Sequence, residues 1–344
     1  MRDGFALLKL TRVQSIQMPA VTQIAVLEEF NLLIILSNRI LIWYHLDVVC
    51  PATGPPVPQI DASTRKAPQK LSGSKDVGFF VTAKVKDRAL VIYQKRDGIN
   101  SNFKMLEPVL QKNATSKSRW LNASRIRGPT EFFRDYDEFY VPTETYGMNV
   151  FHSSIAVASR KGMQVIMLEK KQVWEVPNRQ PDSRETPSHL ASISARIRDL
   201  KPLGMFRLSD AEFLVTLSEC AIYVNKQADV SRSVIMDFVG RAYAACLYYP
   251  YLILFNDDFV EIRDAQNGRL KQVIAGRGIT MLDDGGSAQA GAGHNHTTLG
   301  GGGGGINGSS TPASSPRTVK IGMQHPEHDR LYVVVELLLV DERH

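Results

Sequence analysis

The chain has 344 residues, 43% hydrophobic and 22% charged, a composition that allows a globular fold with a sizeable core. Its 41 Lys and Arg residues outnumber its 35 Asp and Glu residues only slightly, and they are scattered along the sequence. Such scattered cations predict an ordinary solvated surface and argue against a nucleic-acid-binding arm.

The most apolar stretch, FNLLIILSNRILIWYHL at residues 30–46, predicts a β-hairpin. A membrane span needs about 20 apolar residues, and an Arg at its centre costs roughly 2.5 to 3.5 kcal/mol. Here Ser37, Asn38 and Arg39 interrupt the stretch at its midpoint. The two halves have the length and the Ile and aromatic content of strands. Neither half alternates between apolar and polar residues, so we expect both faces of these strands to be buried.

The same pattern of two apolar runs around a polar break recurs along the chain and predicts a β-propeller. Apolar runs begin near residues 30, 77, 153, 211 and 251, and the 76-residue gap leaves room for a weaker copy around EFFRDYDEFYVP at 131–142. A repeat of about 40 to 50 residues with several short strands is typical of propeller blades. The recurrences span residues 77–95, 153–177, 211–225 and 251–274, the last with an Asn267-Gly268 hairpin turn.

The expected fold is therefore all-β, a single seven-bladed propeller over residues 1–344, with six or eight blades as alternatives. Three insertions interrupt the pattern, at about 50–75, at 177–195 with a short helix at its end, and at 283–316. The last is so rich in Gly and Ser that we expect it to be disordered. Strand-like runs at 5–17 and 331–340 predict that both chain ends share one blade and close the ring.

No stretch of the sequence predicts catalysis, cofactor binding or a metal site. GGGGG at 301–305 lacks the Lys-Ser/Thr of a phosphate-binding loop, and the HNH (294–296) and HPEH (325–328) segments have no Cys partners at ligand spacing. Asp257 and Asp258 stand where a hairpin needs a turn. EKKQVWEV at 169–176 predicts a turn followed by a strand whose Trp packs inward. An enzyme with catalytic residues dispersed over several blades is the less favoured alternative.

The three cysteines, Cys50, Cys220 and Cys246, are too few and too widely spaced for a disulfide framework. We expect reduced, mostly buried thiols in an intracellular protein, and no secretory signal opens the chain. The expected location is the cytoplasm.

Three separated parts of the chain have a recognisable order of motifs. They are TRVQSIQMPAVTQIAVLEEFNLLIILSNRILIWYHLDVV near the start, LSDAEFLVTLSECAIYVNKQADVSR with YYPYLILFNDDFVEIRDAQNGRLKQVI in the second half, and IGMQHPEHDRLYVVVELLL at the end. Together these segments resemble the citron homology (CNH) domain of fungal Rho-type guanine-nucleotide exchange factors. The resemblance extends over about residues 5–340, with the segments in the same order as in the family.

The resemblance implies a seven-bladed, non-catalytic module that regulates an exchange factor and binds proteins. The catalytic exchange domain of that family is a long helical bundle, for which this chain has no room. A Rho-family GTPase is the implied partner, the exchange domain of the parent protein is a second one, and fungal cell-wall integrity signalling is the implied process. The alternatives are autoinhibition and docking on phosphoinositide membranes at the inner face of the plasma membrane.

The family supplies no binding residues that can be transferred, so the candidates rest on residue type. Arg and aromatic side chains near the centre of a surface dominate protein interfaces. SRWLNASRIRGP at 118–129 and EFFRDYDEFYVP combine these types in the least regular part of the chain. The candidate protein-binding residues are Arg119, Trp120, Arg125, Arg127, Arg134 and Tyr136. The simpler reading of each is a core aromatic or a solvated charge.

Overall fold

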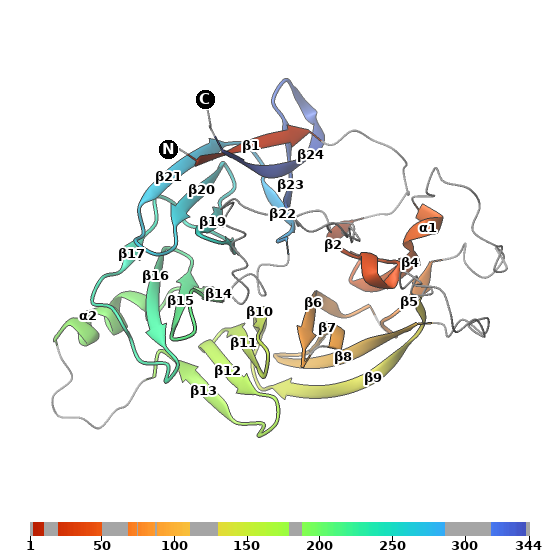
Figure 1. Cartoon of the computed structure of the whole chain (residues 1–344), viewed down its shortest axis with the longest axis horizontal. Helices are drawn as coiled ribbons and strands as arrows, with labels where there is room; N and C mark the ends of the chain where they lie inside the picture. Colours follow the sequence, from red (N-terminus) through yellow and green to blue (C-terminus); the bar gives the residue numbers. More distant parts are fainter. Residues whose placement is uncertain are drawn as a thin grey trace, which may run out of the picture.

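The computed structural model describes residues 3–9, 20–49, 68–73, 75–86, 88–110, 130–178, 188–285 and 318–341. In these residues six four-stranded antiparallel sheets are arranged as blades around a central axis, so the chain is a β-propeller (Figure 1). In each blade one edge strand lies next to the centre of the ring and the opposite edge strand lies at its periphery.

The blades follow one another along the chain. From the centre outward, blade I consists of β2 (Val21–Leu27), β3 (Leu32–Ser37), β4 (Ile40–His45) and β5 (Gln69–Lys70). Blade II consists of β6 (Val77–Val85), β7 (Arg88–Asp97), β8 (Asn100–Leu110) and β9 (Thr130–Val141). Blade III consists of β10 (Thr145–Val150), β11 (Ser154–Ser159), β12 (Gly162–Met167) and β13 (Val173–Val176). Blade IV consists of β14 (Pro202–Arg207), β15 (Glu212–Leu217), β16 (Cys220–Asn225) and β17 (Met236–Asp237). Blade V consists of β18 (Ala244–Tyr248), β19 (Tyr251–Phe255), β20 (Phe259–Asp264) and β21 (Leu270–Ala275). Blade VI consists of β22 (Thr280–Asp283), β23 (Val319–His325), β24 (His328–Asp341) and β1 (Asp3–Lys9).

The hairpin predicted at residues 30–46 is confirmed as β3 and β4. Ser37 pairs with Ile40, which leaves Asn38 and Arg39 as a two-residue turn with φ of 49° and 62°. Positive φ at both central residues is the geometry of a type I′ turn, whose twist matches that of the flanking strands. All six residues of β3 are buried, so the expected burial on both faces is confirmed for this strand. The expectation is wrong for β4, in which buried residues alternate with partly exposed ones.

The prediction of seven blades is wrong, because the described residues form six. The EFFRDYDEFYVP segment is not a weaker repeat but strand β9, which pairs with β8 from Ser101↔Val141 to Leu110↔Thr130. Strands β7, β8 and β9 are 10, 11 and 12 residues long, so one blade fills most of the interval that had suggested two. The spacing between apolar runs therefore gives the number of blades only where the strands of all blades have similar lengths.

The prediction that both chain ends close the ring in one blade is confirmed. Strand β1 pairs with β24 in register from Asp3↔Asp341 to Lys9↔Val335, and β24 also pairs with β23. Figure 1 shows the two termini side by side at this blade. The outermost strand of blade VI thus comes from the opposite end of the sequence, which removes a free seam from the ring.

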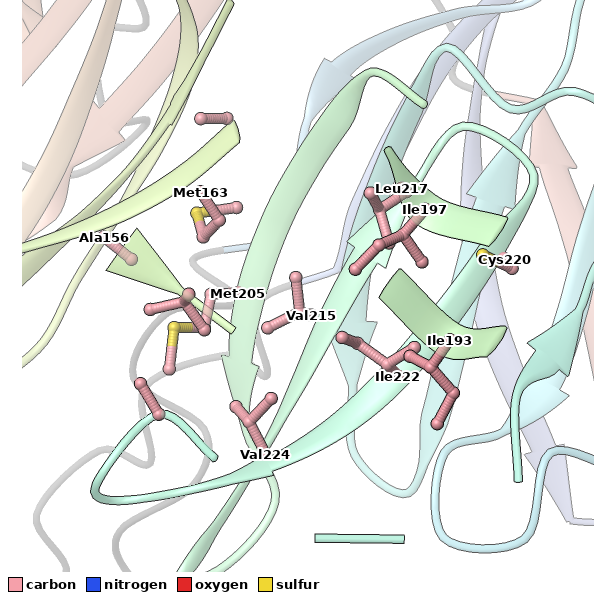
Figure 2. Packing of buried hydrophobic residues seen from close by; sticks show 13 residues of the cluster. Ala156, Met163, Ile193, Ile197, Met205, Val215, Leu217, Cys220, Ile222 and Val224 are labelled. Atoms are coloured by element: carbon pink, nitrogen blue, oxygen red, sulfur yellow. The ribbon is translucent and has the colours of Figure 1, made fainter. Parts of the chain in front are cut away.

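The hydrophobic core lies between neighbouring blades rather than in one central mass. Figure 2 shows the layer between blades III and IV, where Ala156 and Met163 face Met205 and Val215. Helix α2 (Ser188–Ile197) places Ile193 and Ile197 against the same layer, which confirms the helix predicted at the end of the 177–195 insertion. Two further short helical segments are η1 (Glu28–Phe30) and α1 (Leu46–Val49).

Polar side chains join the innermost strands of adjacent blades. Gln23 of blade I accepts a hydrogen bond from the Phe80 N–H (2.9 Å) and donates one to the Phe80 carbonyl (3.3 Å). Asn149 of blade III accepts a hydrogen bond from the Met205 N–H of blade IV at 2.8 Å. These side chains satisfy backbone groups that neighbouring blades cannot pair directly, and so they link adjacent blades.

The remaining insertions lie mostly outside the described residues. These are 50–67 of the first insertion, 179–187 of the second and 286–317 of the Gly-rich third, including the GGGGG and HNH segments.

Candidate functional site

Two of the six predicted binding residues can be placed in the structure. Arg134 and Tyr136 lie on β9, the outermost strand of blade II. Arg119, Trp120, Arg125 and Arg127 lie outside the described residues.

Arg134 and Tyr136 line a surface depression of about 600 Å³. It opens at the end of blade II where β6 turns into β7. The six lining residues are contributed by that turn and by β7, β8 and β9; they are Lys86, Arg88, Glu107, Arg134, Asp135 and Tyr136.

The strand register explains how these side chains meet. Arg134 stands directly opposite Glu107, and a β-bulge follows, where Asp135 pairs with Leu106 but Asp137 pairs with Met105. Tyr136 is the extra residue at this bulge. A bulge bends the strand and redirects the side chain it carries, which here leaves Tyr136 facing Arg88. The Arg88 guanidinium carbon lies 5.8 Å from the centre of the Tyr136 ring.

Glu107 is the anchor of the depression. Its carboxylate accepts hydrogen bonds from Arg88 Nη1 at 3.3 Å and from Arg134 Nη2. The Glu107 side chain is 17% exposed, whereas those of Arg88 and Arg134 are 51% and 58% exposed. One largely buried carboxylate therefore orients two half-exposed guanidinium groups toward solvent.

Two ion pairs connect this depression to the β12–β13 turn of blade III. Lys86 Nζ lies 2.5 Å from Glu169, and Lys171 Nζ lies 2.5 Å from Asp137. The hydrogen bond between Lys86 and Glu169 raises the pKa of the lysine and lowers that of the carboxyl, with their mutual charge attraction adding to both shifts. A hydrogen bond from Lys104 to Asp135 of the depression also raises the pKa of Lys104.

This arrangement suits recognition of a protein surface. Two oriented guanidinium groups next to a tyrosine can form paired hydrogen bonds to a partner carboxylate and also bury apolar area. Arg and Tyr are the side chains most often found at the energetic centre of protein interfaces. Phe132, two residues before Arg134 on the same strand, is a further exposed aromatic residue, with 50% of its surface exposed.

Sequence reasoning missed Lys86, Arg88, Glu107 and Glu169, because strand pairing rather than sequence proximity brings them to β9. The prediction that Trp174 packs inward is also wrong. Trp174 lies on the four-residue outermost strand β13 and is 44% exposed. A peripheral strand has no neighbour on its outer side, so its aromatic residue reaches the surface.

The Asp257-Asp258 and HPEH segments lie at turns between strands. Asp257 and Asp258 form the β19–β20 turn, in which the Asp258 carbonyl accepts a hydrogen bond from Gly276. His325 and His328 flank the β23–β24 turn with ring centres 4.9 Å apart. Within the described ranges, no group of three or more His, Cys, Asp or Glu side chains could hold a metal ion.

Cys220 and Cys246 are both buried free thiols, and Cys50 lies outside the described residues. Burial raises the pKa of Cys220 to about 11 and also raises that of Cys246. Since the thiolate is the reactive form, about one Cys220 in a thousand is ionised at pH 8.

We therefore expect a Cys50→Ser variant to resist a thiol-specific chromogenic reagent at pH 8 in the folded state. After denaturation the same variant should react at two thiols per chain. The measurement is absorbance against time with and without denaturant, and rapid labelling of the folded variant would contradict the burial described here.

Comparison with known proteins gives a consistent set of matches. Residues 7–285 match the family described as the CNH domain. The chain is 27% identical to Rho1 guanine nucleotide exchange factor 1 of Schizosaccharomyces pombe over 83% of this chain and 20% of that protein. It is 24% identical to RHO1 GDP-GTP exchange protein 2 of Saccharomyces cerevisiae over 79% of this chain and 18% of that protein. The chain therefore spans about a fifth of the length of these relatives.

Among solved structures, the fold is similar to one described as the AfRom2 CNH domain, with a TM-score of 0.65 and 24% sequence identity. The match covers 94% of this chain and 82% of that one, so it supports the fold over nearly the whole sequence. None of the helices in the described part of the chain is long and apolar enough to cross a membrane.

Proposed function

This chain belongs to the CNH domain family, and we propose that it is the non-catalytic, protein-binding module of a fungal Rho guanine-nucleotide exchange factor. The observation that carries this proposal is the pattern of matches. Most of this chain aligns with exchange factors of two yeasts, yet it accounts for only about a fifth of each of them. That is the relationship expected of one regulatory domain in a longer signalling protein.

We propose further that the partner is a Rho-family GTPase and that the process is cell-wall integrity signalling. The names of the relatives, which refer to Rho1, support the choice of GTPase. The depression on blade II, with Arg88, Arg134 and Tyr136 around Glu107, is the surface we assign to the contact. The sheet of blade II holds these side chains in place, so they lose little conformational entropy when a partner binds.

The test is a titration of the purified chain with a Rho GTPase loaded with GDP or with a non-hydrolysable GTP analogue. We expect saturable binding in at least one nucleotide state. Replacing both Arg88 and Arg134 by Ala should weaken it more than about tenfold, because truncating a residue at an interface centre costs roughly 2 kcal/mol or more. Isothermal calorimetry gives both affinities.

A matched control removes two ion-paired surface cations elsewhere, Arg207 and Lys271, which pair with Asp210 and Asp264 on blades IV and V. This double Ala variant should bind like the unchanged chain. If both double variants bind the GTPase with the same affinity, the contact lies outside the depression on blade II. No binding in either nucleotide state would contradict the GTPase assignment and favour a contact with the exchange domain of the parent protein.

A further inference from the structure

The two ends of the propeller differ in which connections they carry. Strands within a blade alternate in direction, so the turns between second and third strands open on the same end as the connections from one blade to the next. We call this end face one. The depression on blade II adjoins the β6–β7 turn, which joins a first to a second strand, so it opens toward the opposite end.

Charge is unevenly distributed over face one. The described turns and adjoining strand ends at 38–39, 71–73, 75–76, 95–100, 142–144 and 160–161 carry six cations and three carboxylates. We call this surface of blades I to III the basic half, and its cations are Arg39, Lys75, Lys95, Arg96, Arg160 and Lys161. Each of these six cations is exposed. The turns of blades IV to VI on the same face carry the opposite excess, with Arg241 and Arg277 against Glu219, Asp257, Asp258 and Glu327. The described part of the connection from blade III to blade IV lies between the two halves and adds Arg198, Lys201, Asp199 and Arg196, the last of which pairs with Glu219.

Contacts across the blade boundary fix the cations of blades I and II relative to one another. Arg39 lies 3.8 Å from Asp76, and its carbonyl accepts a hydrogen bond from Val77 at 3.1 Å. The Arg96 N–H in turn donates to the Asp76 carbonyl at 2.9 Å. Arg39 and Arg96 therefore lie on either side of Asp76. Only the Arg39 guanidinium is paired with the Asp76 carboxylate.

A buried polar network extends this fixed arrangement to blade III. The side chain of Gln94 donates to Ser101 Oγ at 3.0 Å, and Ser101 Oγ donates to the Thr143 carbonyl at 3.0 Å. One residue further, the Glu144 carbonyl accepts a hydrogen bond from the Arg160 N–H at 2.9 Å. The basic half thus rests on rigid turns of three consecutive blades.

An apolar side chain protrudes from the basic half. Asp97 pairs with Asn100, so Gly98 and Ile99 form a two-residue turn, and Gly98 has φ of +60°. Glycine at the first central position is the requirement of a type II′ turn, and this places Ile99 at the tip. Ile99 is 77% exposed, more than any other large hydrophobic side chain in the described residues.

We propose that the basic half of face one docks on an anionic phospholipid membrane, with its cations over the headgroups and Ile99 inserted between the lipids. A membrane surface is the partner that matches cations spread over three blades, because its charge is also laterally extended. It accounts as well for an exposed isoleucine between cations, since peripheral proteins add apolar insertion to electrostatic attraction. Repulsion between the carboxylates in the turns of blades IV to VI and the anionic headgroups would orient the ring so that blades I to III face the lipid.

The test is co-sedimentation of the purified chain with phosphatidylcholine vesicles that contain or lack phosphatidylserine. We expect binding only to the vesicles with phosphatidylserine, and we expect it to fall steeply as the ionic strength rises, because the Debye length shortens. Each cation near the surface contributes about fivefold to the partition coefficient. The Lys95→Glu/Arg96→Glu variant should therefore bind at least about tenfold more weakly.

The matched control is Arg241→Glu/Arg277→Glu, which makes the same change in charge on the acidic half of face one. It should keep its binding, and both variants should keep the melting temperature of the unchanged chain.

Ile99→Ser should weaken binding at high and low salt alike, whereas Ile99→Leu should not. Equal loss in the two charge variants, or no preference for phosphatidylserine, would overturn the proposal. GTPase binding through blade II should survive the Lys95/Arg96 changes, which separates this result from the proposed function.

Discussion

Deletion of residues 331–344 is expected to turn a soluble, cooperatively folding chain into an insoluble one. These residues include most of β24, which pairs with β1 on one side and with β23 on the other. Without them, blade VI keeps no hydrogen-bonded link between β1 and the rest of the ring. The edges of β1 and β23 are then free to pair with other chains, which is the usual route to aggregation of sheet proteins.

The loss also reaches the core. Val335 and Leu337 are buried between blades V and VI, in the cluster that includes Phe255 and Ile321. Burial of one such aliphatic side chain contributes about 1.5 to 3 kcal/mol, so losing both removes about 3 to 6 kcal/mol, a large part of the net stability of a typical domain.

The measurements are the soluble fraction after expression and thermal unfolding followed by circular dichroism. Deleting only residues 342–344, which follow β24, is the control and should leave both unchanged. A soluble 331–344 deletion with one sharp transition would show that the ring does not depend on its closing blade.

Replacing Glu261 by Ala is expected to lower the free energy of unfolding by about 3 kcal/mol. Glu261 has no exposed surface, and its carboxylate accepts hydrogen bonds from Arg263 Nε at 2.5 Å and from the Val239 N–H at 3.0 Å. Arg263 is itself only 12% exposed, so removing the carboxylate leaves a largely buried cation without its counter-charge. Breaking one partner of a buried pair costs far more than the pair contributes as a whole.

Guanidinium denaturation with linear extrapolation gives this free energy. Glu261→Gln should cost less, because the amide oxygen still accepts a hydrogen bond from Val239 and the side-chain volume is preserved. Asp210→Ala removes one member of an exposed pair with Arg207 and should cost less than about 1 kcal/mol. An Asp210 effect as large as that of Glu261 would contradict the role assigned to burial.

The candidate site shows where sequence reasoning reached its limit. The mixed Arg and aromatic content of residues 131–142 indicated a surface for partner binding, and Arg134 and Tyr136 do line a depression. Lys86, Arg88 and Glu107 could not be anticipated, because register and a β-bulge decide which side chains on β7, β8 and β9 meet. A shift of one residue would have turned each of them to the other face of the sheet.

The sequence by itself determined that the chain is built from short hairpins, that strands such as β3 and β19 are buried on both faces, and that the two ends pair. These properties follow from local composition: apolar runs without alternation, polar two-residue turns, and strand-forming segments at both termini. Only the tertiary structure decided the number of blades, the exposure of Trp174 and the charge asymmetry of face one. The reason is physical: each depends on how long neighbouring strands pair and on which turns share one end of the ring, and these are set by contacts between residues far apart in the chain.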